Sequence, residues 1–321
     1  MMPAPKKARA LDDVPSPIVT SSKKSIVIAD SEFAARDDDH PAVPPPRPYV
    51  FDKKIIKDLS VGIRLGMNIL LTGPTGCGKT SVISAIANRT KQPMVRFNCD
   101  GETRVSNLRG MMKPTAKDGV LTLQFSLGDL AFAMQEGWWV LLDEIDAALP
   151  SVLFVLQPVL EEDRRELHVP EEQKSIEAHP DFRIFATGNT IGFRALARAR
   201  HAGTNPMNAA FVDRFGMVIS CDYPSKDEEF ERIKVNVPGL QDIVIEGVAR
   251  VADRLRHDDK FKTDFSTRRC VQWARLIKEF DNDVLRAAEL AILRKLESPS
   301  DAKVAREIIE RQFGYTDAEK R

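Results

Sequence analysis

The sequence is poor in cysteine and histidine, carries no net charge and has no long apolar run. Four of its 321 residues are cysteines and five are histidines, and they are scattered without a CxxC pair or the spacing of a zinc site. This argues against a disulfide-stapled secreted domain and against a structural zinc centre. It indicates reduced thiols in a cytoplasmic protein.

Charge and hydropathy argue against further classes of protein. Because 47 basic residues are balanced by 47 acidic ones, the chain does not coat nucleic acid by net charge alone. A balanced total charge is still compatible with a local basic channel. No apolar stretch reaches the roughly 18 residues of a transmembrane helix, and no apolar core follows the first lysines. We therefore expect neither a membrane span nor a secretory signal. The composition, 43% hydrophobic and 29% charged, is globular, and the length suffices for two domains.

Residues 1–48 differ from the rest of the chain. They hold nine of the 20 prolines and a single aromatic residue, Phe33, and they include the run DDDHPAVPPPRP. Such a segment cannot bury enough apolar surface to fold alone. We predict a flexible, proline-rich and charged N-terminal arm, which serves either as a partner-binding segment or as a plain linker.

From residue 49 onward the pattern is that of regular secondary structure. Apolar strands such as NILLTG, WWVLLDEID and FRIFATG alternate with helices over 49–224. This predicts an α/β core with a parallel sheet covered by helices on both faces. Only helical patterns follow over 225–321, where we predict a separate all-helical domain. Two inserts, residues 110–129 and 161–182, have the alternating pattern of short hairpins.

The segment NILLTGPTGCGKTS, residues 68–81, carries the strongest motif. It fits GxxxxGK[ST] between a predicted strand and a predicted helix, the arrangement of a phosphate-binding loop. Glycines let backbone N–H groups point at phosphate oxygens, and the helix adds its positive end. Lys79 is expected to reach the β- and γ-phosphates of ATP, and Thr80 to hold Mg²⁺ through its hydroxyl. The predicted nucleotide-binding residues are Gly73, Pro74, Thr75, Gly76, Cys77, Gly78, Lys79, Thr80 and Ser81.

The segment WWVLLDEID ends an apolar strand in two carboxylates. Asp143 at the tip of a buried strand beside the loop is what a Mg²⁺ site needs, and Glu144 is placed to act as the general base that activates water. Alone, the pair would be read equally well as charges at a helix N-terminus. With the phosphate loop upstream, the hydrolytic interpretation is favoured.

Three further residues are weaker candidates when taken one by one. Asn189 ends the segment FRIFATGN and would orient the attacking water. Arg214, in the segment DRF, would neutralise γ-phosphate charge, and Arg268, in STRR, would reach the nucleotide from the helical domain. A single arginine is more often a surface or salt-bridging residue, so these roles rest on context.

The order of these motifs resembles that of AAA+ ATPases. The resemblance covers about residues 49–315 and is greatest to the MoxR/chelatase branch, in particular to the CobS-type subunit of cobaltochelatase. HPDFRIFATGNTIG and STRRCVQWARLIKEF carry this resemblance. It implies that Asn189 is sensor 1, Arg214 the arginine finger and Arg268 sensor 2. The S-T-R of the last motif departs from the more usual S-P-R.

The resemblance also implies an assembly and a function. It implies a ring, usually a hexamer, in which Arg214 of one subunit completes the site of the next, and a partner protein with a von Willebrand A-type domain. We therefore expect a motor ATPase that remodels a protein partner. The alternatives are a nucleic-acid-directed motor, McrB-like or helicase-loader-like, and a non-hydrolysing nucleotide-gated scaffold. Met111, Met112 and Phe125 of the first insert either touch a partner or pack within the hairpin.

Overall fold

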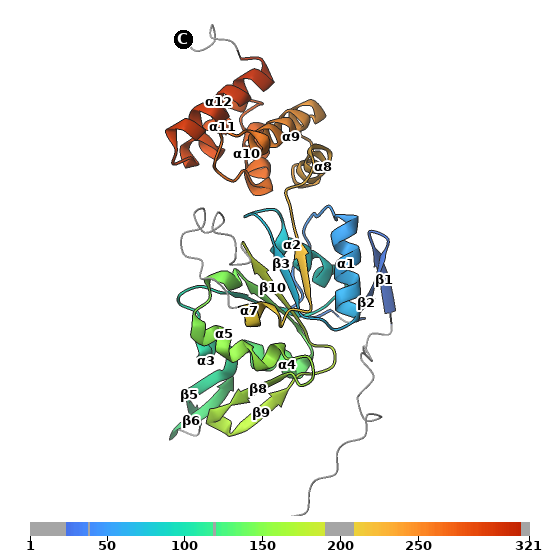
Figure 1. Ribbon diagram of the computed structural model, residues 1–321, viewed down its shortest axis with the longest axis vertical. Coiled ribbons are helices and arrows are strands. Elements are labelled where there is room, and N and C mark those ends of the chain that lie inside the picture. Colours follow the sequence, from blue (N-terminus) through green and yellow to red (C-terminus); the bar gives the residue numbers. More distant parts are fainter. Residues whose placement is uncertain (1–23, 38, 118–119, 190–208, 316–321) are drawn as a thin grey trace, which may run out of the picture.

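The computed structural model describes residues 24–37, 39–117, 120–189 and 209–315. The α/β part is followed by a helical part, called the lid below, and the connection between them runs from the last strand of the sheet into the first lid helix, as Figure 1 shows. Among the described residues, no helix is both long and apolar enough to cross a membrane.

A five-stranded parallel sheet forms the centre of the α/β part. Its strand order is β11-β3-β10-β7-β4, and every neighbouring pair is parallel, which confirms the predicted sheet. The strands are β3 (Ile69–Thr72), β4 (Met94–Asn98), β7 (Trp139–Asp143), β10 (Arg183–Gly188) and β11 (Met217–Ser220). Strands β3, β7 and β10 are buried at every position, as expected for strands covered on both faces.

Helices cover both faces of the sheet. Alternate residues of β3 point to opposite faces: Ile69 and Leu71 join the core cluster that includes α1 and α2, whereas Leu70 joins the cluster of α4 and α5. The helices of this part are α1 (Lys53–Arg64), α2 (Lys79–Arg89), α3 (Val105–Arg109), α4 (Asp129–Glu136), α5 (Pro150–Leu156) and α7 (Ala209–Val212), with short 3-10 turns η2 (Ile145–Ala147), η3 (Pro158–Leu160) and η4 (Pro170–Glu172).

Both inserts are antiparallel hairpins, as predicted. The first pairs β5 (Gly110–Lys117) with β6 (Val120–Leu127), and the second pairs β8 (Glu166–Val169) with β9 (Lys174–Glu177). Figure 1 places the two hairpins together, at the end of the α/β part remote from the helical part. The second hairpin buries its apolar residues in the core, whereas Leu121 and Leu123 of the first are exposed.

The helical part has a hydrophobic core of its own. Trp273 and Phe265 are among its fully buried side chains. Its elements are α8 (Lys226–Asn236), α9 (Asp242–His257), α10 (Thr267–Glu279), α11 (Val284–Ala291), η5 (Leu293–Lys295) and α12 (Pro299–Phe313). Side-chain caps fix where these helices begin: Ser225 forms a capping box with Glu228 at α8, and Ser266 caps α10.

The prediction of a flexible arm over residues 1–48 is wrong for residues 24–36. Strands β1 (Lys24–Ile28) and β2 (Ser31–Ala35) pair in a hairpin, and Ile28 and Phe33 are buried in the core cluster that contains α1. The Arg36 backbone N–H then donates to the Thr90 carbonyl at 3.0 Å. The hairpin is too small to fold alone, but α1 supplies the apolar surface that completes it. Residues 1–23 lie outside the described part.

We expect the hairpin to contribute to the stability of the α/β part. Phe33→Ala removes a ring that is 3% exposed, and should lower the free energy of unfolding in urea by about 3 kcal/mol. Val27→Ala, at a side chain that is 72% exposed, is the matched control and should change it by less than about 0.5 kcal/mol. Equal urea midpoints for the two variants would show that the hairpin is not part of the folded core.

Candidate functional site

The phosphate loop lies between the end of β3 and the start of α2, and its glycines hold backbone conformations that other residues rarely adopt. The φ angles of Gly73, Gly76 and Gly78 are 147°, 74° and 116°. A Cβ on Gly73 would lie 1.9 Å from the carbonyl oxygen of Cys221, and one on Gly76 would lie 2.6 Å from the Cβ of Ser266. The loop is therefore packed between the end of β11 and the start of α10.

The ammonium group of Lys79 is folded back into the loop. Its Nζ donates to the carbonyl oxygens of Gly73 at 2.8 Å and Pro74 at 2.9 Å, and to Oδ1 of Asn189 at 3.1 Å. The residue is 7% exposed. The structure thus brings together Lys79 and Asn189, which the sequence analysis placed in one site, because β3 and β10 are parallel neighbours that end at the same edge of the sheet.

The carboxylate of Asp143 is held by three elements. Thr80 at the start of α2 donates to Oδ1 at 2.7 Å, Thr187 on β10 donates to the same oxygen, and the Arg96 guanidinium on β4 donates to Oδ2. Burial by itself raises the pKa of Asp143, but the hydrogen bonds from Thr187 and Thr80 and the charge of Arg96 lower this pKa below its ordinary value. The carboxyl group is therefore ionised at neutral pH.

The donor set beside the loop fits Mg²⁺. This ion takes hard oxygen ligands, and the Thr80 hydroxyl and the ionised Asp143 carboxylate already touch each other. The described residues contain no cluster of three or more His, Cys, Asp or Glu that could hold a metal. A metal at this position would therefore depend on phosphate and water oxygens for its remaining ligands.

Glu144 follows directly and has a left-handed backbone, with φ of 56°. A non-glycine residue in this region is strained, and such strain clusters at functional sites. The Glu144 N–H donates to the Thr187 hydroxyl at 3.1 Å, which fixes the backbone, while its side chain is exposed at the sheet edge. The Asn189 N–H donates to Asp146 Oδ2 at 3.0 Å, and this bond fixes the backbone of Asn189 at the same edge of the sheet.

The two arginines predicted from the sequence lie in different places. Arg214, just after α7, donates through Nε to Glu161 at 2.8 Å and through Nη1 to the Ala210 carbonyl at 2.7 Å. Within the described residues its guanidinium therefore binds Glu161 and not the phosphate loop of its own chain. Arg268 is exposed in the first turn of α10, the helix whose cap, Ser266, packs on the loop.

The sequence analysis missed four residues that touch the site. Arg96 and Thr187 bind Asp143, as described above. The Tyr223 hydroxyl donates to the Thr75 carbonyl at 3.0 Å, and Arg232 donates to the Cys77 carbonyl at 3.2 Å. Only Thr187 had a local signal, since it lies two residues before Asn189 on the same predicted strand. The other contacts depend on strand register and on how the helical part packs.

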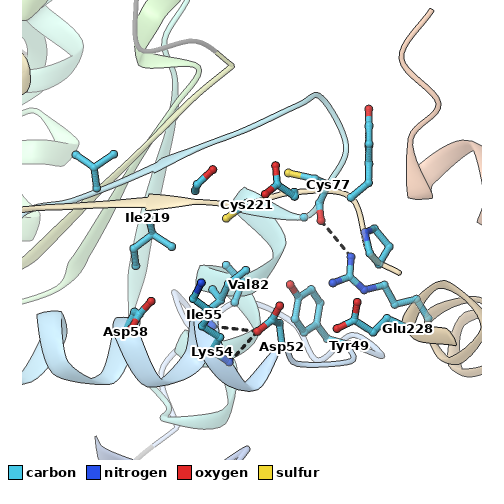
Figure 2. Close-up of a pocket in the computed structure, with 17 residues that line it drawn as sticks. Tyr49, Asp52, Lys54, Ile55, Asp58, Cys77, Val82, Ile219, Cys221 and Glu228 are labelled. Atoms are coloured by element: carbon cyan, nitrogen blue, oxygen red, sulfur yellow. Dashed lines mark hydrogen bonds between the residues drawn. The ribbon is translucent and has the colours of Figure 1, made fainter. Parts of the chain in front are cut away.

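A cavity of about 360 Å³ adjoins the loop (Figure 2). The start of α1, the end of β11 and helix α8 form its walls, and its lining includes Tyr49, Cys77, Cys221, Tyr223 and Arg232. Burial raises the pKa of Cys221 to about 12, and also raises the pKa values of Cys77 and Tyr49. These groups are therefore neutral, so the cavity wall offers uncharged thiol and phenol groups beside the Arg232 guanidinium.

Comparisons with known proteins identify the family of the chain. The family model described as AAA domain (dynein-related subfamily) matches residues 68–215. The aerobic cobaltochelatase subunit CobS of Sinorhizobium sp is 32% identical over 273 residues, which cover 83% of this chain and 81% of that protein. An uncharacterized protein of Staphylococcus haemolyticus is 30% identical over 267 residues, covering 82% of this chain and 97% of its own length.

Two further similarities cover less or are weaker. Midasin of Giardia intestinalis is 35% identical over 178 residues, which span 56% of this chain but 3% of midasin. The solved structure of a RuvB mutant from Thermotoga maritima superposes with a TM-score of 0.49 at 18% identity, covering 82% of this chain and 76% of that one.

Proposed function

Since the chain belongs to the AAA ATPases of the dynein-related subfamily and resembles CobS, we propose that it is a Mg²⁺-dependent ring motor that remodels a protein partner. The observation that carries this proposal is the set of polar groups at one sheet edge. Lys79 donates a hydrogen bond to Asn189, Thr80 donates one to Asp143, and Glu144 follows Asp143 in the chain.

Each of these groups has a role in ATP hydrolysis that its position supports. The Lys79 ammonium exchanges its bonds to the Gly73 and Pro74 carbonyls for bonds to phosphate oxygens. Thr80 and Asp143 would hold Mg²⁺, and the ion would supply positive charge against the phosphates. Glu144 accepts the proton of the attacking water, and Asn189 orients that water.

The nucleoside fits the cavity beside the loop. Tyr49 and Tyr223 give it aromatic walls, and Cys77 and Gly78, the loop residues that precede Lys79, also line it. The lining also carries two cations, Lys54 and Arg232, and four carboxylates, those of Asp52, Asp58, Asp222 and Glu228. Because the carboxylates outnumber the cations and repel phosphate, the cavity suits a base better than another phosphate. Arg268, in the first turn of α10, is the lid residue proposed to sense the γ-phosphate.

The ring assembly rests on the position of Arg214. In its own chain this guanidinium pairs with Glu161 and not with the phosphate loop, so a role at a nucleotide would place it in the site of a neighbouring copy. An arginine supplied by a neighbour neutralises charge that develops on the γ-phosphate and accelerates hydrolysis by about 10³–10⁵. We infer a closed ring, hexameric as in related motors, in which each site is shared by two subunits.

We propose that the partner is a protein with a von Willebrand A-type domain. The pathway is either metal chelation, as for the CobS relative, or another pathway that uses the same kind of motor. The first hairpin supports a protein partner, since Met111, Met112, Leu121 and Leu123 expose apolar surface at the end of the molecule remote from the lid. The four buried, unpaired cysteines support a cytoplasmic location.

Glu144→Gln tests hydrolysis and captures the partner in one preparation. The variant should bind ATP as the wild type does but hydrolyse it at least about 100-fold more slowly, because the general base is lost. Glu136→Gln, an exposed position on α4, is the control and should keep full activity. Steady-state phosphate release measures both, and a wild-type rate in Glu144→Gln would disprove the assigned base.

The same variant, held with ATP, serves for affinity capture. Recovery of a von Willebrand A-type protein supports the proposed function. Recovery of nucleic acid, with hydrolysis that DNA stimulates and salt suppresses, would replace it with a nucleic-acid-directed motor.

Mixing two inactive variants tests whether neighbouring subunits share a site. Arg214→Ala and Lys79→Met should each hydrolyse ATP at least about 100-fold more slowly than the wild type. A 1:1 mixture should recover about a quarter of the wild-type rate, because one interface in four pairs an intact loop with an intact arginine. A mixture no more active than its components, together with a monomeric mass by light scattering in Mg²⁺ and ATP, would refute the ring.

A further inference from the structure

Four residues connect the phosphate loop to the first turn of α10 through a continuous series of contacts. They are Tyr223, Arg256, Glu229 and Thr267, named the hinge relay below. We propose that the hinge relay fixes the angle between the helical part and the phosphate loop and so positions Arg268 over the nucleotide. The effect of the hinge relay on nucleotide affinity rests on the proposed function, whereas its effect on the angle between the two parts of the chain does not.

The relay begins at the segment that joins the two parts of the chain. Tyr223 lies between the end of β11 and the start of α8, and its hydroxyl donates to the Thr75 carbonyl at 3.0 Å. Lys79 takes the two preceding carbonyls, those of Gly73 and Pro74. These two donors therefore occupy three successive loop carbonyls. If the Lys79 ammonium moves, it releases the Pro74 carbonyl, which is next to the Thr75 carbonyl that Tyr223 holds.

Arg256 is the centre of the relay. Its guanidinium carbon lies 4.5 Å from the centre of the Tyr223 ring, within the range of a cation–π contact. Its Nε donates to the Phe265 carbonyl at 2.9 Å, and its Nη2 donates to Glu229 at 2.7 Å. One side chain of α9 thus joins the connecting segment, helix α8 and the turn before α10.

The relay ends at the helix that carries Arg268. The Thr267 hydroxyl donates to Glu229 Oε2, the same oxygen that receives Arg256, at 3.1 Å. Thr267 is the first residue of α10, between the cap Ser266 and Arg268. Since Ser266 packs on Gly76, the loop is held by Tyr223 at Thr75 and by the start of α10 at the next residue.

Burial shows that this arrangement is more than a surface contact. The side chains of Arg256 and Glu229 are 6% and 0% exposed, and among the ion pairs of the described residues no other has both partners so fully enclosed. A buried pair gains little stability over apolar residues of the same size, because both charges lose their water. In this protein we infer that the pair supplies geometry instead: Glu229 on α8 accepts from Arg256 on α9 and from Thr267 at the start of α10, which joins the three helices beside Tyr223.

The test avoids truncating the buried pair, because a lone buried charge would unfold the helical part. Tyr223→Phe and Thr267→Val each remove one hydroxyl from the relay and keep its apolar body. Thr122→Val, on the exposed first hairpin, is the matched control. Spin labels at two exposed positions, Glu136→Cys on α4 and Arg250→Cys on α9, report the distance between the two parts, since the native cysteines are all buried.

In the nucleotide-free full chain, the control should give a single narrow distance distribution, and both relay variants should broaden or split it. Affinity for a fluorescent ATP analogue in Mg²⁺ should fall about 5-fold in each relay variant. The double variant should lose much less than about 25-fold in affinity, because the effects of two substitutions in one connected unit do not add as free energies.

Two results overturn the proposal: a distribution unchanged by Tyr223→Phe and Thr267→Val, or losses of affinity that multiply as for independent sites. If the wild type does not bind the analogue at all, the proposed function fails, and the distance distributions alone decide the hinge relay.

Discussion

The ionised carboxylate of Asp143, buried at the end of strand β7, is the interaction on which the site depends. A charge in this position is costly unless it is hydrogen-bonded, and Thr80, Thr187 and Arg96 supply the bonds from α2, β10 and β4. These contacts join the end of β7 to its neighbours β10 and β4, and they hold the start of α2, and with it the phosphate loop, beside them. The order of the sheet and the chemistry of the site are therefore one constraint.

Much of the fold and the centre of the site could be predicted from the sequence. The strands are short, almost wholly apolar and separated by helices, and such strands form parallel sheets covered on both faces. Parallel strands end at one edge, so the motifs that follow β3, β7 and β10 had to meet there. The contact between Lys79 and Asn189, residues 110 positions apart, follows from this rule together with the pairing of β3 and β10. The two hairpins were visible as alternating patterns because each is a local structure.

Contacts set by register or by packing between distant elements could not be predicted. Arg96 reaches Asp143 because β4 pairs with β7 in one register, and nothing in the sequence of β4 indicates that register. The N-terminal hairpin was obscured by its proline-rich surroundings, and its apolar residues are buried only because α1 lies beside them. Tyr223 and Arg256 are ordinary residues in the sequence and gain a role from the packing of the helical part on the loop. The roles of Arg214 and Arg268 stay predictions that a nucleotide-bound assembly would test.

The central claim is that the loop at residues 73–80 binds the phosphates of ATP through Lys79 and through a metal held at Thr80 and Asp143. The direct measurement is the equilibrium affinity of the wild type and of Lys79→Met for a fluorescent ATP analogue, with and without Mg²⁺. The account predicts an affinity that Mg²⁺ increases in the wild type and that falls about 100-fold in Lys79→Met, as expected for the loss of a buried charge-assisted contact. Equal affinities in the two proteins, or binding indifferent to Mg²⁺, would contradict it.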